Sequence, residues 1–461
     1  MCAGWAQDIV WQRVYDVTST ADYPCGAIDS CGNILLAGTY SDSGNYGIML
    51  VKCNADGDIL WLRRYDTQVQ NEHVYACAAD SEGGVVISGE SHPANSCLII
   101  KYDSAGNLIW IKQDKVGYLS YLNGVAVDES LNIYVSGTTM SLNPPSYDLL
   151  LIKYNVNGDL LWVRTYDWGW DEEGGVITLL PDGNVAGIGS LGSEEQWWFD
   201  FLIYKFAPNG DLLWSKVLNV KNEDWGYGVS TDYESNIYGG GFAGQFFNGW
   251  IVPDSLVVFK YTPDGDLEWV KVFGNDDYSG GGAVVTDDLG NVLIAGCSYD
   301  TIRRKSSSLL FCYNNQGEYR WNCVLRDSIN NLELLDIVGS FPAIIYGMGI
   351  LSNGLFSKFA IIKFRYPTGL GEFGPKFNKT HSYFSLATPV CAGAPLRFSV
   401  GCAGDYRLVV RDVSGQERLV YAGYLARGEN RISLPSLPAG VYFLELAGAG
   451  VQRRHRLVVV R

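Results

Sequence analysis

The sequence predicts an all-β protein: a seven-bladed β-propeller followed by a small Ig-like β-sandwich. Three observations lead to this prediction. Tryptophans recur every 49 to 55 residues, strand-like segments recur between them, and the charge balance changes near residue 385. Helix signals are nearly absent and glycine is abundant, with 54 residues in 461, which is typical of many short strands joined by turns.

The repeat is clearest around the segment GDLLW, which occurs at 158–162 and 210–214. Its tryptophans are Trp11, Trp61, Trp110, Trp162, Trp214, Trp269 and Trp321. One repeat, residues 121–167, contains YLNGVAVD, NIYVSGTT, DLLLIKYN and NGDLLWVRTYD, each rich in Val, Ile, Leu and Tyr. Four strands in a unit of this length predict a propeller blade, because such units bury both faces only by stacking in a ring.

The two ends of the repeat region complement each other. Residues 8–16 form an outer strand with no blade before it, and residues 336–364 supply three strands without a fourth. We therefore expect the N-terminal strand to complete the seventh blade, within a propeller domain spanning 1–366. The alternative is a degenerate outer strand around Phe373 in GLGEF, although flanking glycines and a nearby proline make it a poor strand.

We interpret the repetition as structural. NGD and DGD predict hairpin turns with Asn or Asp and Gly at positive φ. The tryptophan that follows should dock its ring between blades, contributing about 2–3 kcal/mol through buried area. The alternative for NADGD and TPDGD is a Ca²⁺ loop, but the spaced ligands and distal glutamate of such loops are missing. We therefore predict no metal.

Residues 8–366 resemble bacterial β-propeller repeat proteins with Trp-bearing outer strands. The G-x-x-x-W segment is also similar to the tryptophan-docking motif of quinoprotein dehydrogenases. Those enzymes generally have eight blades, a Ca²⁺ site and a vicinal cysteine pair near the quinone. No two cysteines are adjacent in this chain, so we expect no quinone and no other cofactor.

The chain after the propeller divides into a linker, 367–384, and a domain, 385–461. That domain holds ten Arg, no Lys and five acids, although the whole chain has a net charge of −16. Its short strands predict an Ig-like sandwich. The pieces YRLVVRDVSGQ (406–416), GENRISLPSLPAGVYFLEL (428–446) and HRLVVVR (455–461) resemble the type A-like C-terminal sorting domain of type IX secretion cargo.

That resemblance implies a secreted or cell-surface protein whose residues 385–461 are recognised by outer-membrane secretion machinery. The alternative is a plain Ig-like module, similar to flagellar hook-cap sandwiches. The start, MCAGWAQ, shows no signal peptide; its small residues fit the remnant of a cleavage region whose upstream part is removed or missing. The chain has no apolar run long enough to cross a membrane, and its acidity argues against nucleic acid as a partner.

Eleven cysteines are present without a C-x-x-C motif, which disfavours zinc. Blades 1 to 5 carry Lys five residues before the turn Gly, and Arg or Lys two residues after the Trp. Blade 6 has Cys312 and Cys323 at these two positions. We predict a cross-strand disulfide between them, and therefore an oxidising compartment; the alternative is two buried thiols. Cys391 and Cys402 form a second candidate pair.

Six tryptophans outside the repeat gather in one stretch of sequence. They are Trp168, Trp170, Trp197, Trp198, Trp225 and Trp250. Their positions predict loops on one face of the ring above blades four and five. Acids crowd the same loops, including Asp171, Glu172, Glu173, Glu194, Glu195, Asp200, Glu223 and Asp224. Aromatic rings beside carboxylates suit a sugar, a cation or a peptide; the alternative is that the loops use Trp to pack on one another.

We predict a non-catalytic binding protein for a glycan or an extracellular protein, with no catalytic residue assigned. The first alternative is an extracellular carbohydrate-active enzyme, a hydrolase or lyase, using loop carboxylates. The second is a structural surface protein without a small ligand. The four histidines are isolated in sequence, and His73 occupies a repeat position, which favours packing over catalysis.

Overall fold

The protein is described by a computed structural model. It describes residues 9–16, 20–42, 44–67, 71–142, 145–192, 198–247, 250–274, 278–287, 290–300, 305–325, 331–340, 344–353, 357–365, 390–391, 395–400, 404–412, 416–425, 428–433, 440–448 and 451–460. All regular secondary structure in these residues is β-strand, so the predicted all-β class is confirmed. No described helix is long and apolar enough to traverse a bilayer.

The described strands from Ile9 to Arg365 form seven antiparallel sheets, which we call blades 1 to 7. Blade 1 contains β2 (Thr20–Ile28), β3 (Ile34–Asp42), β4 (Asn45–Cys53) and β5 (Ile59–Tyr65). Blade 2 contains β6 (Asn71–Ala79), β7 (Val85–His92), β8 (Ser96–Tyr102) and β9 (Leu108–Asp114). Blade 3 contains β10 (Leu119–Val127), β11 (Ile133–Leu142), β12 (Pro145–Tyr154) and β13 (Leu160–Tyr166). Blade 4 contains β14 (Glu172–Glu173), β15 (Ile177–Leu179), β16 (Val185–Gly192), β17 (Phe199–Phe206) and β18 (Leu212–Leu218).

The remaining blades follow the same order. Blade 5 contains β19 (Glu223–Thr231), β20 (Ile237–Phe247), β21 (Trp250–Tyr261) and β22 (Leu267–Gly274). Blade 6 contains β23 (Tyr278–Thr286), β24 (Val292–Asp300), β25 (Lys305–Tyr313) and β26 (Tyr319–Leu325). Blade 7 contains β27 (Asn331–Ser340), β28 (Ile344–Ser352), β29 (Ser357–Arg365) and, as its outer strand, β1 (Ile9–Tyr15). The fourth strand of blade 7 thus comes from the start of the described chain.

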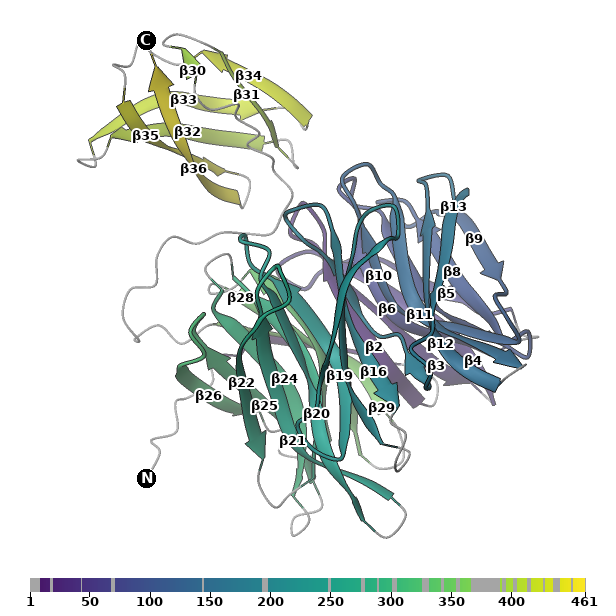
Figure 1. Cartoon of the computed structure of the whole chain (residues 1–461). Coiled ribbons are helices and arrows are strands. Elements are labelled where there is room, and N and C mark those ends of the chain that lie inside the picture. The colour runs from purple at the N-terminus through teal and green to yellow at the C-terminus, as the bar shows by residue number, and fades with distance from the viewer. Residues whose placement is uncertain are drawn as a thin grey trace.

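The blades surround a central axis, with the first strand of each blade on the inside (Figure 1). Each inner strand contacts the inner strand of the next blade, and β27 contacts β2, so the ring is continuous. Strand β1 pairs antiparallel with β29, with Arg13 opposite Ile361 and Tyr15 opposite Phe359. Tyr15 and Phe359 lie in one apolar cluster that joins blade 7 to blade 1. Phe373, the alternative closing residue, lies outside the described residues.

The repeated tryptophans are wedges between neighbouring blades. The indole N–H of Trp61 donates to Ser104 O at 3.0 Å, and that of Trp214 donates to Pro263 O at 3.0 Å. Each acceptor lies in the turn of the following blade, two residues before the turn glycine. That glycine has φ of +79° at Gly106 and +86° at Gly265, and a Cβ on either would touch the Trp ring. The motif therefore joins a Trp in one blade to a Gly in the next.

The turns themselves differ from the sequence prediction in one respect. Only the glycine adopts positive φ; the Asn or Asp directly before it does not. In several turns an Asn or Asp three residues before the glycine accepts backbone N–H groups with its side chain. Asp103 Oδ1, for example, accepts the backbone N–H groups of Ala105 at 2.9 Å and Asn107 at 2.7 Å. These side-chain contacts close the turn locally. They support a structural role for the turn acids.

Trp214→Ala should lower the free energy of unfolding by about 3–5 kcal/mol, because it removes a large ring from an interblade contact. Trp214→Phe should cost less, because it keeps part of the packing and loses mainly the indole hydrogen bond, worth about 1 kcal/mol. Urea unfolding followed by circular dichroism measures both. Trp170→Ala is the control, since that ring is 40% exposed. Equal losses for Trp214→Ala and Trp170→Ala would contradict the wedge assignment.

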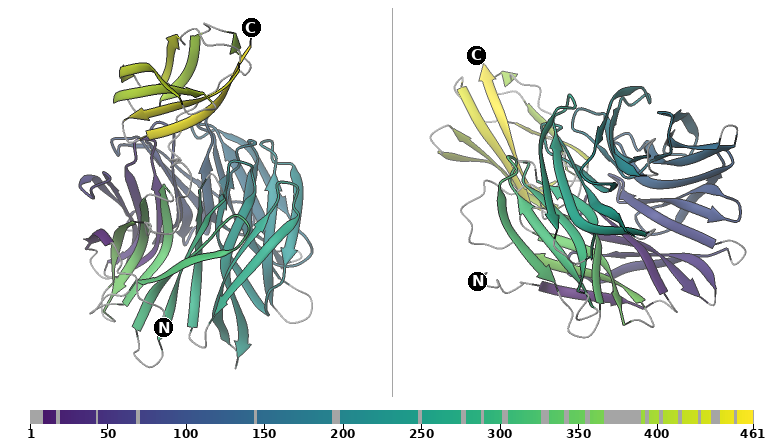
Figure 2. Two further views of the ribbon diagram at one scale, coloured as in Figure 1. Left: turned by 90° about the vertical axis from the view of Figure 1, so that its left-hand side faces the viewer. Right: turned by 60° about the horizontal axis from the view of Figure 1, so that its bottom comes forward.

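The C-terminal strands form two further sheets, in a unit that lies beyond one end of the ring in Figure 1 and in the left view of Figure 2. One sheet has the order β30 (Val390–Cys391), β36 (Val451–Val460), β35 (Gly440–Gly448), β32 (Gly404–Asp412) and β33 (Glu417–Leu425). The other pairs β31 (Pro395–Val400) with β34 (Gly428–Ser433). The most buried described side chains of this C-terminal unit are Tyr406, Leu408, Val410 and Leu446.

Candidate functional site

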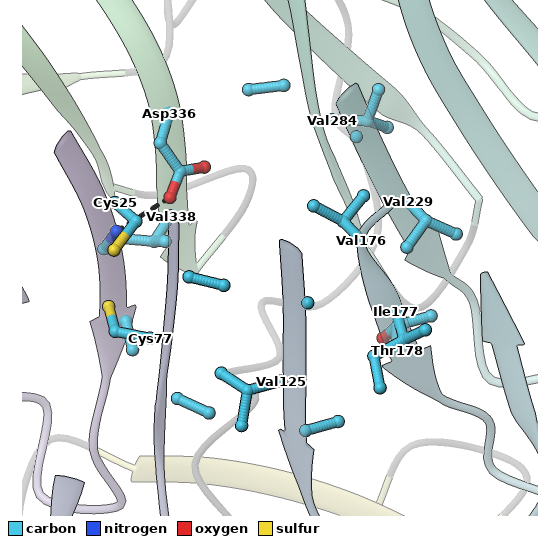
Figure 3. A pocket seen from close by; sticks show the side chains of 18 of the residues that line it. Cys25, Cys77, Val125, Val176, Ile177, Thr178, Val229, Val284, Asp336 and Val338 are labelled. Carbon is cyan, nitrogen blue, oxygen red and sulfur yellow. Dashed lines mark hydrogen bonds between the residues drawn. The ribbon is translucent and has the colours of Figure 1, made fainter. Parts of the chain in front are cut away.

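The inner strands enclose a channel, which forms a cavity of about 2520 Å³. Its middle section is lined by small apolar side chains, including Val125, Val229 and Val284, that point toward the axis (Figure 3). The channel has acids along its length: the lining residues include Asp128, Glu129, Glu173, Asp182, Asp232, Glu333 and Asp336. Lys153 is the one Lys or Arg among the described lining residues.

A repeated β-bulge shapes the channel wall. Register shifts occur at Val74/Ala76 in β6, Leu122/Gly124 in β10 and Gly226/Gly228 in β19. The residue skipped by the ladder is Tyr75, Asn123 or Tyr227, and all three line the channel. A bulge redirects a side chain out of the normal alternation. This device therefore places Tyr and Asn side chains in the channel lining at the middle of the inner strands.

A glycine in the second strand makes room for each bulge. A Cβ on Gly89, Gly137 or Gly241 would lie 1.9 Å from the carbonyl oxygen of His73, Tyr121 or Trp225 respectively. Only glycine permits so close an approach of two backbones. The same strand position is glycine in every blade: Gly38, Gly89, Gly137, Gly189, Gly241, Gly296 and Gly349. This sevenfold recurrence is the signal from which the bulged channel wall could have been predicted.

The part of the channel lined by Tyr23, Tyr75, Trp225 and Tyr227, which we call its mouth, is aromatic. Tyr23 is 54% exposed and meets Tyr75 edge to face, with ring centroids 5.2 Å apart. Tyr227 is 49% exposed and stacks on Phe242 with a centroid distance of 5.5 Å. Trp225 lies beside them in the channel lining. Exposed ring faces held by neighbouring rings are suited to stack on the C–H faces of a ligand.

Carboxylates accompany these rings. Tyr75 donates its hydroxyl to Glu90 Oε1 at 2.6 Å, and Trp225 donates its indole N–H to Glu223 Oε2 at 3.3 Å. Burial, reinforced by the charge of Asp171, raises the pKa of Glu173 in the channel lining to about 7. The mouth thus combines flat apolar faces with hydrogen-bond acceptors and one carboxyl group that titrates near neutral pH.

The structure also brings two histidines together. His73 lies with its ring centroid 6.1 Å from that of His92, and His92 Nε2 lies 3.1 Å from Glu90 Oε2. Burial lowers the pKa of His73, which favours a neutral imidazole. Tyr46 packs against His73 at 4.9 Å. This cluster was not predicted, because the two histidines are nineteen positions apart in the sequence and meet only through the pairing of β6 with β7 in blade 2.

Deeper in the channel, Asp336 bridges blades 7 and 1. Its Oδ2 accepts the backbone N–H of Gly26 at 2.8 Å, and its Oδ1 accepts that of Ile337 at 2.8 Å. Burial nevertheless raises the pKa of Asp336 to about 7. Beside it, the thiols of Cys25 and Cys77 point at one another (Figure 3). Their mutual hydrogen bond, together with burial, raises the pKa of Cys25 well above its usual range.

Protein stability should fall between about pH 4 and pH 7 through Asp336. Its folded pKa, about 7, lies above its ordinary value of 3.8, so the unfolded chain releases the proton first as pH rises. Asp336→Asn should remove this part of the decline, leaving a shallower pH dependence. Urea unfolding of both proteins at several pH values from 4 to 8 measures the effect. If the free energy of unfolding changed with pH equally in the wild type and in Asp336→Asn, the prediction would be contradicted.

The predicted tryptophan site is only partly assembled. Trp225 lines the channel mouth. Trp168 is half-buried and stacks on Tyr166 at 5.9 Å, and the exposed Trp170 follows it in the same connection. Trp198 is half-buried just before β17. The backbone of Trp250 pairs with Phe247 at the hairpin of β20 and β21. Trp197, Glu194 and Glu195 lie outside the described residues.

Two acids from the predicted site have structural contacts. Glu172 Oε1 accepts the backbone N–H of Trp168 at 3.0 Å, and Asp224 Oδ2 accepts that of Val220 at 2.6 Å. Both acids are fully buried, with 0% exposure. They occupy the same strand position in blades 4 and 5 and fix the connection that enters each blade. Packing, one of the two sequence-based interpretations, therefore applies to these two acids and to Trp168.

The predicted Cys312–Cys323 disulfide does not form in the structure, where both residues are thiols. The strand register explains the difference: Cys312 lies opposite Trp321, and Cys323 lies opposite Leu310. Diagonal neighbours of this kind lie beyond the usual Cα separation of a disulfide. Cys31, in contrast, is disulfide-bonded. Of the second candidate pair, only the backbone of Cys391 is described, and Cys402 lies outside the described residues.

Comparisons with known proteins agree on the fold. The polysaccharide lyase Uly1 matches with a TM-score of 0.51 and 7% identity, over 78% of this chain and 100% of that one. The β-propeller domain of the Trilobed protease from Pyrococcus furiosus matches at 0.46 and 9% identity, over 76% and 95% of the two chains. These likenesses concern the fold alone, and they agree with a β-propeller fold.

A sequence relative supports the same conclusion. An uncharacterized WD repeat-containing protein, L264, from Acanthamoeba polyphaga mimivirus is 28% identical over 171 residues, matching 28% of this chain. The match spans only 12% of that protein. No protein-family model matches the chain. The comparisons therefore support a β-propeller fold built from repeats and leave the activity to be argued from the site.

Proposed function

We propose that this chain is a seven-bladed propeller, closed by its N-terminal strand, that binds a neutral or basic glycan at the aromatic mouth of its channel without catalysis. The observation that carries the proposal is the pairing of exposed rings with carboxylates in one opening. Tyr23 and Tyr227 offer ring faces, and Glu173 and Glu333 offer hydrogen-bond acceptors. Sugars are recognised by these two kinds of group together.

The charge of the channel selects the glycan class. Seven acids and one Lys among the described lining residues disfavour a polyanionic chain such as a uronate or sulfated polymer. They favour neutral sugars or amino sugars, whose hydroxyl and ammonium groups donate hydrogen bonds to carboxylates. The glycan ligand predicted from the sequence is thus narrowed to a neutral or amino-sugar glycan. An extracellular protein is the competing ligand.

The test uses the full chain and a panel of soluble glycans that includes neutral, amino-sugar and uronate or sulfated oligosaccharides. Binding is measured by calorimetry. Tyr227→Ala and Trp225→Ala should each weaken binding at least about tenfold. Tyr424→Ala is the matched control, since Tyr424 is a 65% exposed tyrosine in the C-terminal unit. Binding of polyanions only, or equal effects of all three variants, would refute the proposal.

The second candidate is a glycoside hydrolase, and Glu173 favours it. A carboxyl group with a pKa near 7 is suited to act as a general acid. A lyase fits less well, because elimination from a uronate requires cationic groups that neutralise the sugar carboxylate, and the described lining has one Lys. Release of reducing ends from a bound neutral glycan, abolished by Glu173→Gln with binding retained, would establish catalysis.

We also propose that the protein acts outside the cytoplasm, and that residues 385–461 form an Ig-like domain directing type IX secretion. The disulfide at Cys31 supports an oxidising compartment. The two sheets of the C-terminal unit support a sandwich. Expression in a bacterium with type IX secretion machinery provides the test: the full chain should reach the surface or medium, and a chain lacking 385–461 should stay in the periplasm. Equal export of both would reject the sorting role.

A further inference from the structure

Three carboxylates converge at the junction between blades 3 and 4. Asp148 lies in β12, Asp167 follows β13, and Glu172 lies in β14. One carboxylate oxygen from each lies within 4.8 Å of the other two. This cluster is separate from the described channel lining, which includes none of the three residues.

Glu172 gives the cluster an uncompensated buried oxygen. Its side chain is fully buried, and its Oε1 accepts the backbone N–H groups of Trp168 at 3.0 Å and Trp170 at 3.4 Å. Its Oε2 is also buried and has no hydrogen-bond partner among the described residues. A carboxylate oxygen withdrawn from water without a partner is costly, and this cost is relieved by a cation or a proton.

The neighbouring charges favour a cation. Among the described residues, no ion pair involves Asp148, Asp167 or Glu172. Asp148 accepts the hydroxyl of Ser146 at 2.7 Å, and Asp167 accepts the backbone N–H of Gly169 at 2.6 Å. These contacts are neutral. Three acids therefore face one another with no described basic side chain to offset them.

Blade 1 contains the same junction without the third acid. Asp66 and Glu72 stand where Asp167 and Glu172 stand, but Gly47 replaces Asp148. A Cβ on Gly47 would lie 3.1 Å from the Cβ of Asp66, so this position faces the acid directly. Blade 1 instead supplies a donor, the Thr67 hydroxyl, to Glu72 Oε1 at 2.5 Å. Glu72 Oε2 has no hydrogen-bond partner among the described residues, as Glu172 Oε2 has none, so the third carboxylate, Asp148, is what distinguishes this junction from that of blade 1.

We propose that Asp148, Asp167 and Glu172 bind a divalent cation of the Ca²⁺ type. Oxygen-only ligands and high negative charge suit a hard cation, whereas zinc sites usually contain Cys or His. Asp148 and Asp167 belong to blade 3 and its outgoing connection, and Glu172 belongs to blade 4. The ion would therefore tie two blades together and fix the connection that carries Trp168 and Trp170.

The test uses the full chain after treatment with EDTA. Tb³⁺, a Ca²⁺ substitute, is added with excitation of tryptophan, because Trp168 and Trp170 flank the site and should sensitise its emission. Ca²⁺ should displace Tb³⁺ and raise the melting temperature. Asp148→Gly, which copies blade 1, and the milder Asp148→Asn should each weaken Ca²⁺ affinity at least about tenfold.

Asp66→Asn is the matched control, because it removes the equivalent acid from the two-acid junction of blade 1. It should leave Tb³⁺ emission and Ca²⁺ affinity unchanged. Emission that is absent in the wild type would overturn the proposal. Emission that persists equally in both Asp148 variants would assign the ion to other acids and would overturn it as well. Neither outcome depends on glycan binding, so the experiment tests the cation site separately from the proposed function.

Discussion

Gly137→Ala should destabilise the protein by about 3 kcal/mol or more, the upper range for forcing extra atoms into a packed interior. The added Cβ would lie 1.9 Å from the carbonyl oxygen of Tyr121. Because that oxygen belongs to backbone, relief requires moving the bulge in β10. The movement would also displace Asn123, which donates to Gly174 O at 2.8 Å across the blade junction. Thermal and urea unfolding measure the loss.

The control for this substitution is Gly192→Ala in β16. A Cβ there meets its nearest atom, Asp171 O, at 3.3 Å, so a small adjustment suffices. We expect a change in unfolding free energy below about 1 kcal/mol. If Gly137→Ala were as stable as Gly192→Ala, the close contact between the second strand and the bulge would not exist, and the explanation for the sevenfold glycine would fail.

Removing residues 1–16 should have the largest effect of all, leaving a protein that aggregates or melts well below the full chain. The deletion takes away β1, exposes the edge of β29, and removes the Trp11 indole that donates to Ala55 O at 3.3 Å. It also removes Tyr15, which is 6% exposed, and so opens the apolar cluster in which Tyr15 packs with Phe359. Loss of the Trp11 wedge alone should cost about 3–5 kcal/mol, and an open strand edge promotes association between chains.

Removing residues 1–8 is the matched control, because it leaves β1 intact. That shorter deletion should melt within a few degrees of the full chain. The comparison also tests the alternative closure by residues around Phe373: if those residues supplied the outer strand of blade 7, both deletions would be equally stable. Differential scanning calorimetry with size-exclusion chromatography distinguishes the two outcomes.

The architecture could be read from the sequence because its signals are periodic and local. The G-x-x-x-W segment contains both partners of the contact between blades: its Trp packs on the turn Gly of the next blade, as Trp214 does on Gly265. The lone outer strand at 8–16 and the three strands ending near 364 predicted the pairing of β1 with β29. Each of these features depends on strand alternation, turn chemistry or burial, all of which act over a few residues.

The site could be read only in part, because its residues come from seven inner strands. Trp225 was identified by its clustering with other tryptophans, but Tyr23 and Tyr227 were not, since tyrosine is common throughout the strands. Their direction depends on a bulge, whose signal, a glycine in the second strand of each blade, appears only when the seven blades are aligned. The acidic residues led to the opposite error, because residues with structural contacts were assigned to the ligand site. Glu172 and Asp224 were expected beside the tryptophans of the glycan site, yet both are buried away from the channel and accept backbone N–H groups.

The disulfide prediction failed for a related reason. Cys312 and Cys323 change together relative to the other blades, but Lys and Arg at these two positions serve different turns. Lys52 Nζ reaches Gly83 O at 2.7 Å, whereas Arg63 Nε reaches Gly106 O at 2.6 Å. A joint change therefore does not imply contact between the two side chains. Strand register, which sequence spacing fixes poorly at a bulge, decides the pairing.

The central claim is the closed ring, and a disulfide cross-link between β1 and β29 tests it most directly. Val14 lies opposite Ala360 in the pairing of β1 with β29, so Val14→Cys with Ala360→Cys should form a disulfide that peptide mapping detects under non-reducing conditions. Val14→Cys with Glu129→Cys, on a turn of blade 3, should not. Efficient cross-linking of the first pair alone is the predicted result. No cross-link at 14–360 in folded protein would contradict the closed ring, and with it the channel and its aromatic mouth.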